Sequence, residues 1–203
     1  MNLVVPLFST PIYIGEIDVT SDDKTHCAAL PKSEGAFHDF LISHEDRVLD
    51  DPSLDELKKR ATLHVKKYAT DVYKINQDTF DFYINTSWVS DLTSESAVEL
   101  HKHYHSIFTG VIVLECGGLS RLILESRTTP IMSEFLRFGY NEHNIFNSSE
   151  EYFDLIPNHI YLFPSNLGHS AKCLLPGGNL SVIAFDTFIR GNIGKHSSNL
   201  TFN

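Results

Sequence analysis

The sequence predicts a mainly β protein with some α structure, a β-sandwich or jelly roll with its helices on one side. One clear helical segment lies in the first third of the chain, and many short runs of strand-forming residues follow it. A chain of 203 residues can bury one core, so we expect a single domain over 1–203. We divide it into an N-terminal strand and helical support (1–75), a β core (76–194) and a tail (195–203) that frays.

The N-terminal segment at 3–17 is rich in β-branched and aromatic residues but is interrupted by Pro6 and Pro11. Because proline cannot donate to a sheet ladder, this run predicts an edge strand or a bend. An exposed edge strand would permit a homodimer. Residues 18–52 are polar and irregular, and they predict loops with at most one short helix.

The clearest helix is predicted over 53–74. Ser53 is a good N-cap residue, and Glu56 would complete a capping box three positions later. Apolar side chains recur at helical spacing at Leu54, Leu57, Ala61, Val65, Tyr68 and Val72. We expect this stripe to pack the helix against a sheet.

The rest of the chain alternates strand-forming runs with turn residues. Strands are predicted at 80–89, 107–114, 119–124, 159–163, 169–175 and 180–188. The pairs Gly117-Gly118 and Gly177-Gly178 predict tight hairpins. Residues 127–150 are predicted as a long loop.

Charge and composition exclude several classes of function. The net charge of -10 argues against a nucleic-acid surface, which needs a basic footprint. No run approaches the ~18 apolar residues of a membrane span, and the N-terminus does not resemble a secretory signal, so we expect a cytoplasmic protein. The cysteines Cys27, Cys116 and Cys173 lack the spacing of a zinc ribbon and are predicted to be buried thiols.

Histidines are the unusual feature of the sequence, and His101, His103 and His105 lie within one short segment. If that segment is extended, the three side chains face one side. A His-x-His pair can present two imidazoles to one ion, and His169 is the candidate for a third ligand. Three protein ligands with open positions are typical of a catalytic metal site. On spacing alone zinc fits as well as iron, and histidines on a polar edge strand are the alternative.

Five segments in order carry a resemblance to a known family. They are Pro6-Leu-Phe-Ser-Thr-Pro-Ile-Tyr13, Asn85-Thr-Ser-Trp88, His101-x-His103-x-x-Ser106-x-x-Thr109-Gly-Val111, Leu162-Phe-Pro-Ser165…His169 and Ala184-Phe-Asp-Thr-Phe-Ile-Arg-Gly191. Over 3–194 the chain resembles iron(II)- and 2-oxoglutarate-dependent oxygenases of marine bacteria and tailed phages, distant relatives of the prolyl hydroxylases. The resemblance implies a double-stranded β-helix (jelly-roll or cupin-like) core, and the host cytoplasm as location if a phage encodes the protein.

The resemblance also implies the metal ligands and the reaction. His101 matches the first histidine of the family's motif, His103 takes the place of its carboxylate, and His169 matches its distal histidine. The implied cofactors are iron(II) and 2-oxoglutarate, and the implied reaction is hydroxylation of a substrate that the sequence does not identify. A neutral imidazole in place of the carboxylate leaves the iron one positive charge higher. Three imidazoles also suit zinc or copper.

Two departures from the family concern 2-oxoglutarate. The arginine that grips its far carboxylate is missing from 177–181, and a tyrosine that contacts it is replaced within Ile112-Val113. Lys172 and Arg121 are the candidate substitutes, and Ser106 is a further candidate contact. The alternatives are a non-catalytic phage or bacterial structural or binding module on the same barrel, or a cupin that uses another metal.

Two further side chains within these motifs, Trp88 and His105, are not predicted to bind the metal or a substrate. Trp88, the only tryptophan, is predicted to pack in the core rather than stack on a substrate. His105 is expected beside the metal ligands or at the surface, not as a ligand.

Overall fold

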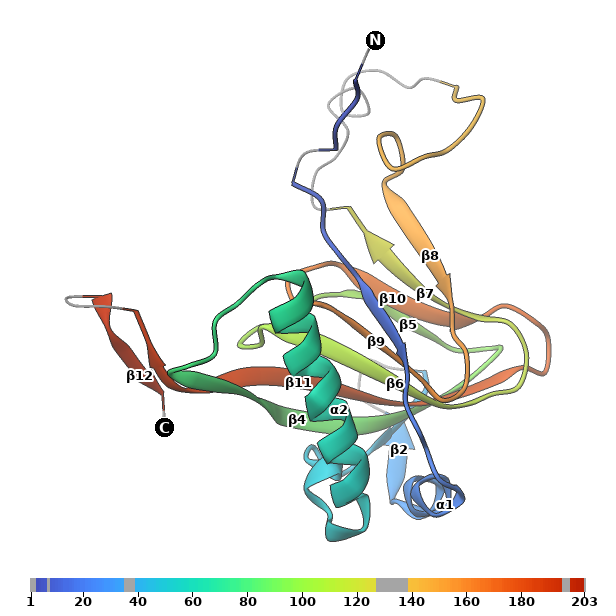
Figure 1. Ribbon diagram of the computed structural model, residues 1–203. Helices are drawn as coiled ribbons and strands as arrows, with labels where there is room; N and C mark the ends of the chain where they lie inside the picture. Colours follow the sequence, from blue (N-terminus) through green and yellow to red (C-terminus); the bar gives the residue numbers. More distant parts are fainter. Residues whose placement is uncertain (1–2, 7, 35–38, 127–138, 195–197, 203) are drawn as a thin grey trace.

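The computed structural model describes residues 3–6, 8–34, 39–126, 139–194 and 198–202 (Figure 1). Its strands form two sheets, and the predicted fold class is confirmed: a mainly β, double-stranded β-helix with helices from the N-terminal part of the chain. The larger sheet has the order β1-β9-β6-β11-β4-β3-β2, with β12 paired to β11, and the smaller has the order β5-β10-β7-β8. No helix among the described residues has the length and apolar character to cross a membrane.

The strands of the larger sheet are β1 (Tyr13–Glu16), β2 (Lys32–Glu34), β3 (Leu41–Ser43), β4 (Phe80–Thr93), β6 (Phe108–Cys116), β9 (His159–Pro164), β11 (Asn179–Ile193) and β12 (Leu200–Phe202). The strands of the smaller sheet are β5 (Ala97–His101), β7 (Ser120–Glu125), β8 (Glu150–Asp154) and β10 (His169–Cys173). The helices are α1 (Ser21–Ala29) and α2 (Asp55–Lys67); two 3₁₀ turns, η1 (Val48–Asp50) and η2 (Pro52–Leu54), precede α2, and a π-helical turn, η3 (Tyr68–Val72), follows it.

Alternation along the central strands divides the interior into two layers. On β6, Phe108 and Ile112 pack with α2 on one face of the larger sheet, which we call the outer layer. Val111 and Val113 point the other way, into the space between the two sheets, which we call the inner layer. Strands β9 and β11 alternate in the same manner. Each central strand therefore serves both a helix-covered core and the space that contains the histidines.

Helix α2 lies across the larger sheet (Figure 1) and buries the predicted stripe. Leu54, Leu57, Ala61, Val65 and Tyr68 are all buried in the outer layer. Val72, the last member of the predicted stripe, is exposed because the chain turns from α-helix to the π-helical turn η3 before it.

The predicted capping box of α2 is wrong. Ser53 lies in η2, where its backbone N–H donates to the Asp51 side chain at 2.8 Å, and α2 begins without a side-chain cap. A capping box does occur at α1, where Thr20 and Asp23 bond to each other's backbone N–H groups. That helix lies in the region predicted as mostly loops, and the strands β2 and β3 there were not predicted.

The chain ends differ from the prediction. Among the described residues of the predicted N-terminal strand, Tyr13–Glu16 pair as β1, which forms an edge of the larger sheet. In the tail predicted over 195–203, Leu200–Phe202 form β12 and pair with Gly191–Ile193 of β11, and 195–197 and 203 lie outside the described residues. Strand β8, which was not predicted, begins at the last residue of the predicted long loop and joins the smaller sheet, and 127–138 of that loop lie outside the described residues.

The two Gly-Gly pairs do not form hairpins between paired strands. Gly117 and Gly118 connect β6 of the larger sheet to β7 of the smaller one, and Gly177 and Gly178 connect β10 to β11. Gly118 and Gly177 have φ of 133° and 73°, which favours glycine at both. These turns carry the chain from one sheet to the other, as a double-stranded β-helix requires.

Candidate metal centre

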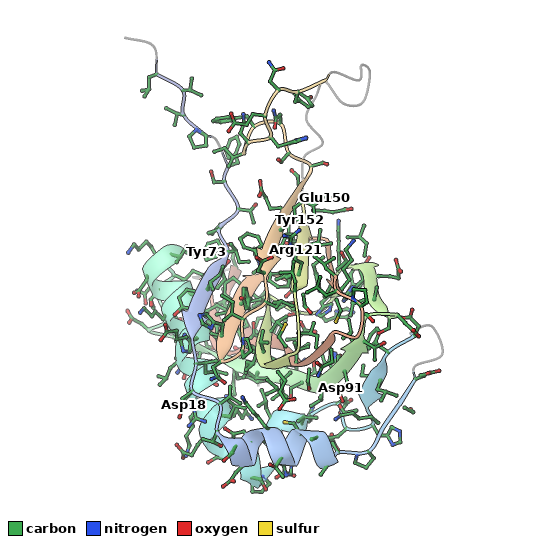
Figure 2. The ribbon with its side chains drawn as sticks, turned by 90° about the vertical axis from the view of Figure 1, so that its right-hand side faces the viewer. Asp18, Tyr73, Asp91, Arg121, Glu150 and Tyr152 are labelled. Atoms are coloured by element: carbon green, nitrogen blue, oxygen red, sulfur yellow. The ribbon has the colours of Figure 1, made fainter. Side chains whose placement is uncertain are left out.

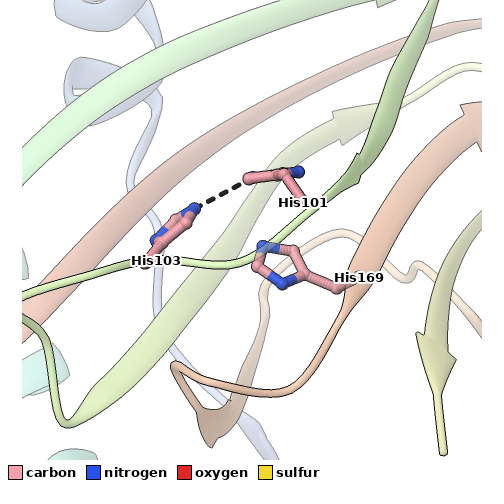
Figure 3. A group of neighbouring side chains, drawn as sticks. All are labelled: His101, His103 and His169. Atoms are coloured by element: carbon pink, nitrogen blue, oxygen red, sulfur yellow. Dashed lines mark hydrogen bonds between the residues drawn. The ribbon is translucent and has the colours of Figure 1, made fainter.

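Three histidines meet at one end of the smaller sheet (Figure 3). His101 is the last residue of β5, His169 is the first residue of β10, and antiparallel pairing sets these two positions opposite each other. His103 lies two residues past β5, in the connection to β6. His105 is exposed, and its φ of 59° shows that the extended chain does not continue to it. The structure thus brings together the three predicted ligands and leaves His105 out.

The ring nitrogens of the three histidines are close enough to share one ion. Their candidate ligand atoms all lie within 4.8 Å of one another. The Nε2 atoms of His101 and His103 are 2.9 Å apart, and the ring centroids of His101 and His169 are separated by 4.2 Å. These distances are short enough for one ring nitrogen of each histidine to bind the same ion.

The hydrogen bonds of the Nδ1 atoms orient all three rings. The acceptors are the Glu99 carbonyl for His101 at 2.8 Å, the Asp186 carboxylate for His103 at 2.7 Å and the Leu167 carbonyl for His169 at 3.0 Å. Because carbonyl and carboxylate oxygens only accept, each Nδ1 carries the proton. Each Nε2 is therefore the ring nitrogen left to bind an ion.

The distance between the Nε2 atoms of His101 and His103 suits a shared metal ion. At 2.9 Å these atoms are within hydrogen-bonding distance of each other (Figure 3). Two nitrogens bound at a right angle to one metal, each at 2.0–2.1 Å, would be about 2.9 Å apart. The donor set therefore fits a divalent metal ion, and three neutral imidazoles suit iron, zinc or copper.

His169 is held in the neutral form that a metal ligand needs. Its side chain is 5% exposed, and burial, with the nearby His101 second, lowers the pKa of His169 to about 3. A proton therefore does not compete for its Nε2 near neutral pH.

Asp186 on β11 is the functional residue that the sequence prediction missed. Its carboxylate accepts from Nδ1 of His103 at 2.7 Å and from the Thr109 hydroxyl at 2.9 Å. A carboxylate behind a metal-binding histidine fixes the ring and raises its basicity. The Asp186 carboxylate thus lies behind the His103 ring and not among the three candidate ligands. Period-two alternation from Val182 through Ala184 could have placed Asp186 in the inner layer.

Ser106 lies behind His103 and does not line the cavity beside the histidines. Its hydroxyl is 2.6 Å from that of Ser165, and the Ser165 hydroxyl is 3.0 Å from that of Thr109. The backbone N–H of His103 donates to the Ser165 carbonyl at 3.0 Å. Ser106 thus belongs to a hydroxyl network that supports the metal-ligand loop, not to the position predicted for a co-substrate contact.

Arg121 and Lys172 lie on the outer face of the smaller sheet. The Arg121 guanidinium donates to Asp154 at 2.8 Å and lies 6.0 Å from the centre of the Tyr152 ring (Figure 2). Lys172 is exposed and pairs with Arg121 in the register of β10 and β7. Their strand neighbours Leu122 and Ala171 face the histidine cavity, so Arg121 and Lys172 point away from it. The predicted substitutes for the family's arginine are not found beside the metal centre.

A cavity of about 310 Å³ adjoins the three histidines in the inner layer. Trp88, predicted to pack in the core rather than stack on a substrate, is half-buried and lines this cavity, with its ring 5.5 Å from that of His103. Among the described residues that line the cavity, none is lysine or arginine. The described lining residues therefore add no positive charge to that of an ion bound by the histidines.

Comparisons with known proteins agree with the fold. No family model and no curated protein matches the chain. It is similar to a 2OG-Fe(II) oxygenase family oxidoreductase from Burkholderia pseudomallei, with a TM-score of 0.55, 10% identity, and 80% of this chain and 75% of that chain covered. It is also similar to HygX from Streptomyces hygroscopicus, solved with nickel, 2-oxoglutarate and hygromycin B bound, with a TM-score of 0.55, 11% identity and coverage of 88% and 82%.

A third similar structure is SnoN, a non-haem α-ketoglutarate-dependent epimerase from nogalamycin biosynthesis. Its TM-score is 0.56 at 8% identity, and 90% of this chain and 81% of that chain are covered. These likenesses show that the chain has the double-stranded β-helix fold of 2-oxoglutarate oxygenases.

Proposed function

We propose that the chain is a non-haem iron(II)-dependent oxygenase. The observation that supports this most directly is the convergence of three Nε2 atoms beside a cavity, in a fold that such oxygenases share. Three protein ligands leave further coordination positions open, which is the arrangement of a catalytic rather than a structural metal site.

Each residue of the centre has a defined task in this proposal. His101, His103 and His169 hold the ion, and Asp186 keeps the Nδ1 proton of His103 and orients its ring. Iron(II) bound there would supply the activation of dioxygen. The apolar walls of the cavity exclude water from the bound substrate.

The same residues fit 2-oxoglutarate less well than they fit the metal. Lys172, Arg121 and Ser106, the predicted contacts, lie outside the cavity. No lysine or arginine among the described lining residues is available for the far carboxylate of a diacid. The proposal therefore extends to a metal-dependent oxygenase and not to this co-substrate.

Anaerobic metal titration with three alanine variants tests the proposal. We expect one iron(II) per chain, with binding abolished in His169→Ala and greatly weakened in His101→Ala, because each loses one imidazole ligand. His105→Ala is the matched control, since this histidine is exposed and outside the cluster, and it should bind iron like the wild type.

Oxygen consumption by the iron-loaded protein and elemental analysis of the purified protein complete the test. Failure of the wild type to bind iron, or equal loss of binding in His105→Ala and His169→Ala, would contradict the proposed site. Purification with stoichiometric zinc and no oxygen uptake after iron loading would favour a cupin that uses another metal.

A further inference from the structure

The cavity beside the metal centre has mainly hydrocarbon walls. Aliphatic side chains from both sheets and the loop before β9 form them: Val111, Leu122, Leu155, Leu180, Val182 and Ala184. At about 310 Å³ the cavity can accept a small organic molecule. Any part of a ligand that extends from the ion into this space therefore lies against apolar surface.

The charges around the cavity favour a ligand with a single negative charge. Three neutral imidazoles leave a divalent ion with its full positive charge, which attracts one anionic head group. The carboxylate of Asp186 lies behind His103, and Glu99 lines the cavity. Among the described lining residues, a second carboxylate on the ligand would meet negative charge and hydrocarbon, and it would lose its hydration without gaining a cationic partner from them.

Two lysines, Lys24 and Lys32, line a neighbouring cavity, and neither lines the histidine cavity. The neighbouring cavity shares Phe40, Leu92 and Leu180 with the histidine cavity. Lys32 nevertheless forms an ion pair with Asp91, at 2.8 Å, and its side chain is 7% exposed. Its charge is therefore already compensated on the far side of the shared residues.

We propose that the ligand of this centre is a monoanionic chelator with an apolar body, such as a 2-oxo acid with an aliphatic or aromatic side chain, rather than the diacid 2-oxoglutarate. The inference rests on the proposed function and names the class of molecule that the metal centre takes. The carboxylate and oxo group of such an acid match the ion, and its side chain matches the apolar walls. The ring of Trp88 adds an aromatic surface beside His103.

Calorimetry on the nickel(II)-loaded protein tests this directly, because nickel(II) replaces iron without consuming oxygen. The probes are 2-oxoglutarate, 4-methyl-2-oxopentanoate and 3-phenylpyruvate, which share one chelating head and differ in the side chain. We expect the two apolar acids to bind about tenfold more tightly or better, because only the diacid buries an unpaired charge. Equal or tighter binding of 2-oxoglutarate would overturn the inference.

A pair of variants at Val182 sharpens the test. This residue on β11 faces the cavity, so Val182→Arg supplies the missing cation, whereas Val182→Leu changes only the volume. We expect Val182→Arg to reverse the preference toward 2-oxoglutarate and Val182→Leu to keep it. If circular dichroism shows that Val182→Arg does not fold, the wild-type ranking still decides.

The outcomes separate this inference from the proposed function. A chain that binds neither nickel nor iron removes both. A chain that binds the ion and prefers 2-oxoglutarate keeps the oxygenase proposal and loses the apolar ligand. Binding of the ion without measurable heat from any of the three acids also overturns the ligand class.

Discussion

The outer and inner layers are built from the same strands but are filled differently. In the outer layer, side chains from the larger sheet and α2 leave almost nothing exposed, and Phe185 fills the space that Gly110 leaves by having no side chain. In the inner layer, strand neighbours of those residues line a cavity of about 310 Å³ with three histidines at one end. The packed, helix-covered face of the larger sheet stabilises the fold. The face toward the smaller sheet leaves space for the candidate metal site and its cavity.

The largest effect is expected in the outer layer. Phe185 is fully buried, so Phe185→Ala should lower the free energy of unfolding by about 3–5 kcal/mol. Urea denaturation of the metal-free protein measures this. Metal affinity of the folded fraction should change little, because the ring points away from the histidines. A loss below about 1 kcal/mol would mean that this layer is not tightly packed.

In the inner layer the corresponding effect is on metal affinity. Asp186→Asn keeps the size of the side chain but removes the charge behind His103, and we expect affinity to fall about 10- to 100-fold. Competition with a chelator of known affinity measures the change. Asp81→Asn is the matched control, because Asp81 lies on β4 in an exposed ion pair with Lys66. Equal losses in both variants would show that Asp186 acts only through overall charge.

The inner layer should also make the metal-free protein sensitive to acid. The pKa of His169 in the folded state, about 3, is below that of an unfolded histidine, so the unfolded state binds the additional proton as pH falls. Stability is therefore highest above pH ~6.5 and should drop by about 2 kcal/mol between pH 7 and 5 from this residue alone. His169→Asn should reduce that drop by a similar amount in urea denaturation at the two pH values. An unchanged pH dependence would show that the ring is not buried in neutral form.

The smallest expected effect is the difference in the free energy of unfolding between two valine-to-alanine variants, one in each layer. Val89 is fully buried in the outer layer, and Val111 lines the cavity. We expect Val89→Ala to cost about 2 kcal/mol and Val111→Ala about 1 kcal/mol or less, because the second truncation only enlarges an existing cavity. Thermal or urea unfolding measures both. The reverse order would contradict the division into a filled and an open layer.

The sequence was most informative where one periodicity dominates. Helix α2 and the central strands followed from apolar spacing, and the convergence of His101, His103 and His169 followed from motif order. Periodicity identifies a strand but does not specify which other strand it pairs with. For that reason the Gly-Gly turns were predicted as hairpins, whereas they connect strands of different sheets.

Single residues depended on tertiary context that no local pattern carries. Trp88 looked like a core residue because its strand is apolar, yet it borders the cavity. Arg121 and Lys172 were selected for their charge, and only the register of β7 and β10 shows that they face outward. Asp186 lies in a strand whose other residues are mostly apolar, and no local pattern indicated that it contacts His103.

A crystal structure of the iron(II)-loaded protein, prepared without oxygen, tests the central claim most directly. One ion should be bound by the Nε2 atoms of His101, His103 and His169, with each Nδ1 still bonded to its oxygen acceptor. Iron at another place, or an ion that leaves the His169 ring unbound, would contradict the account.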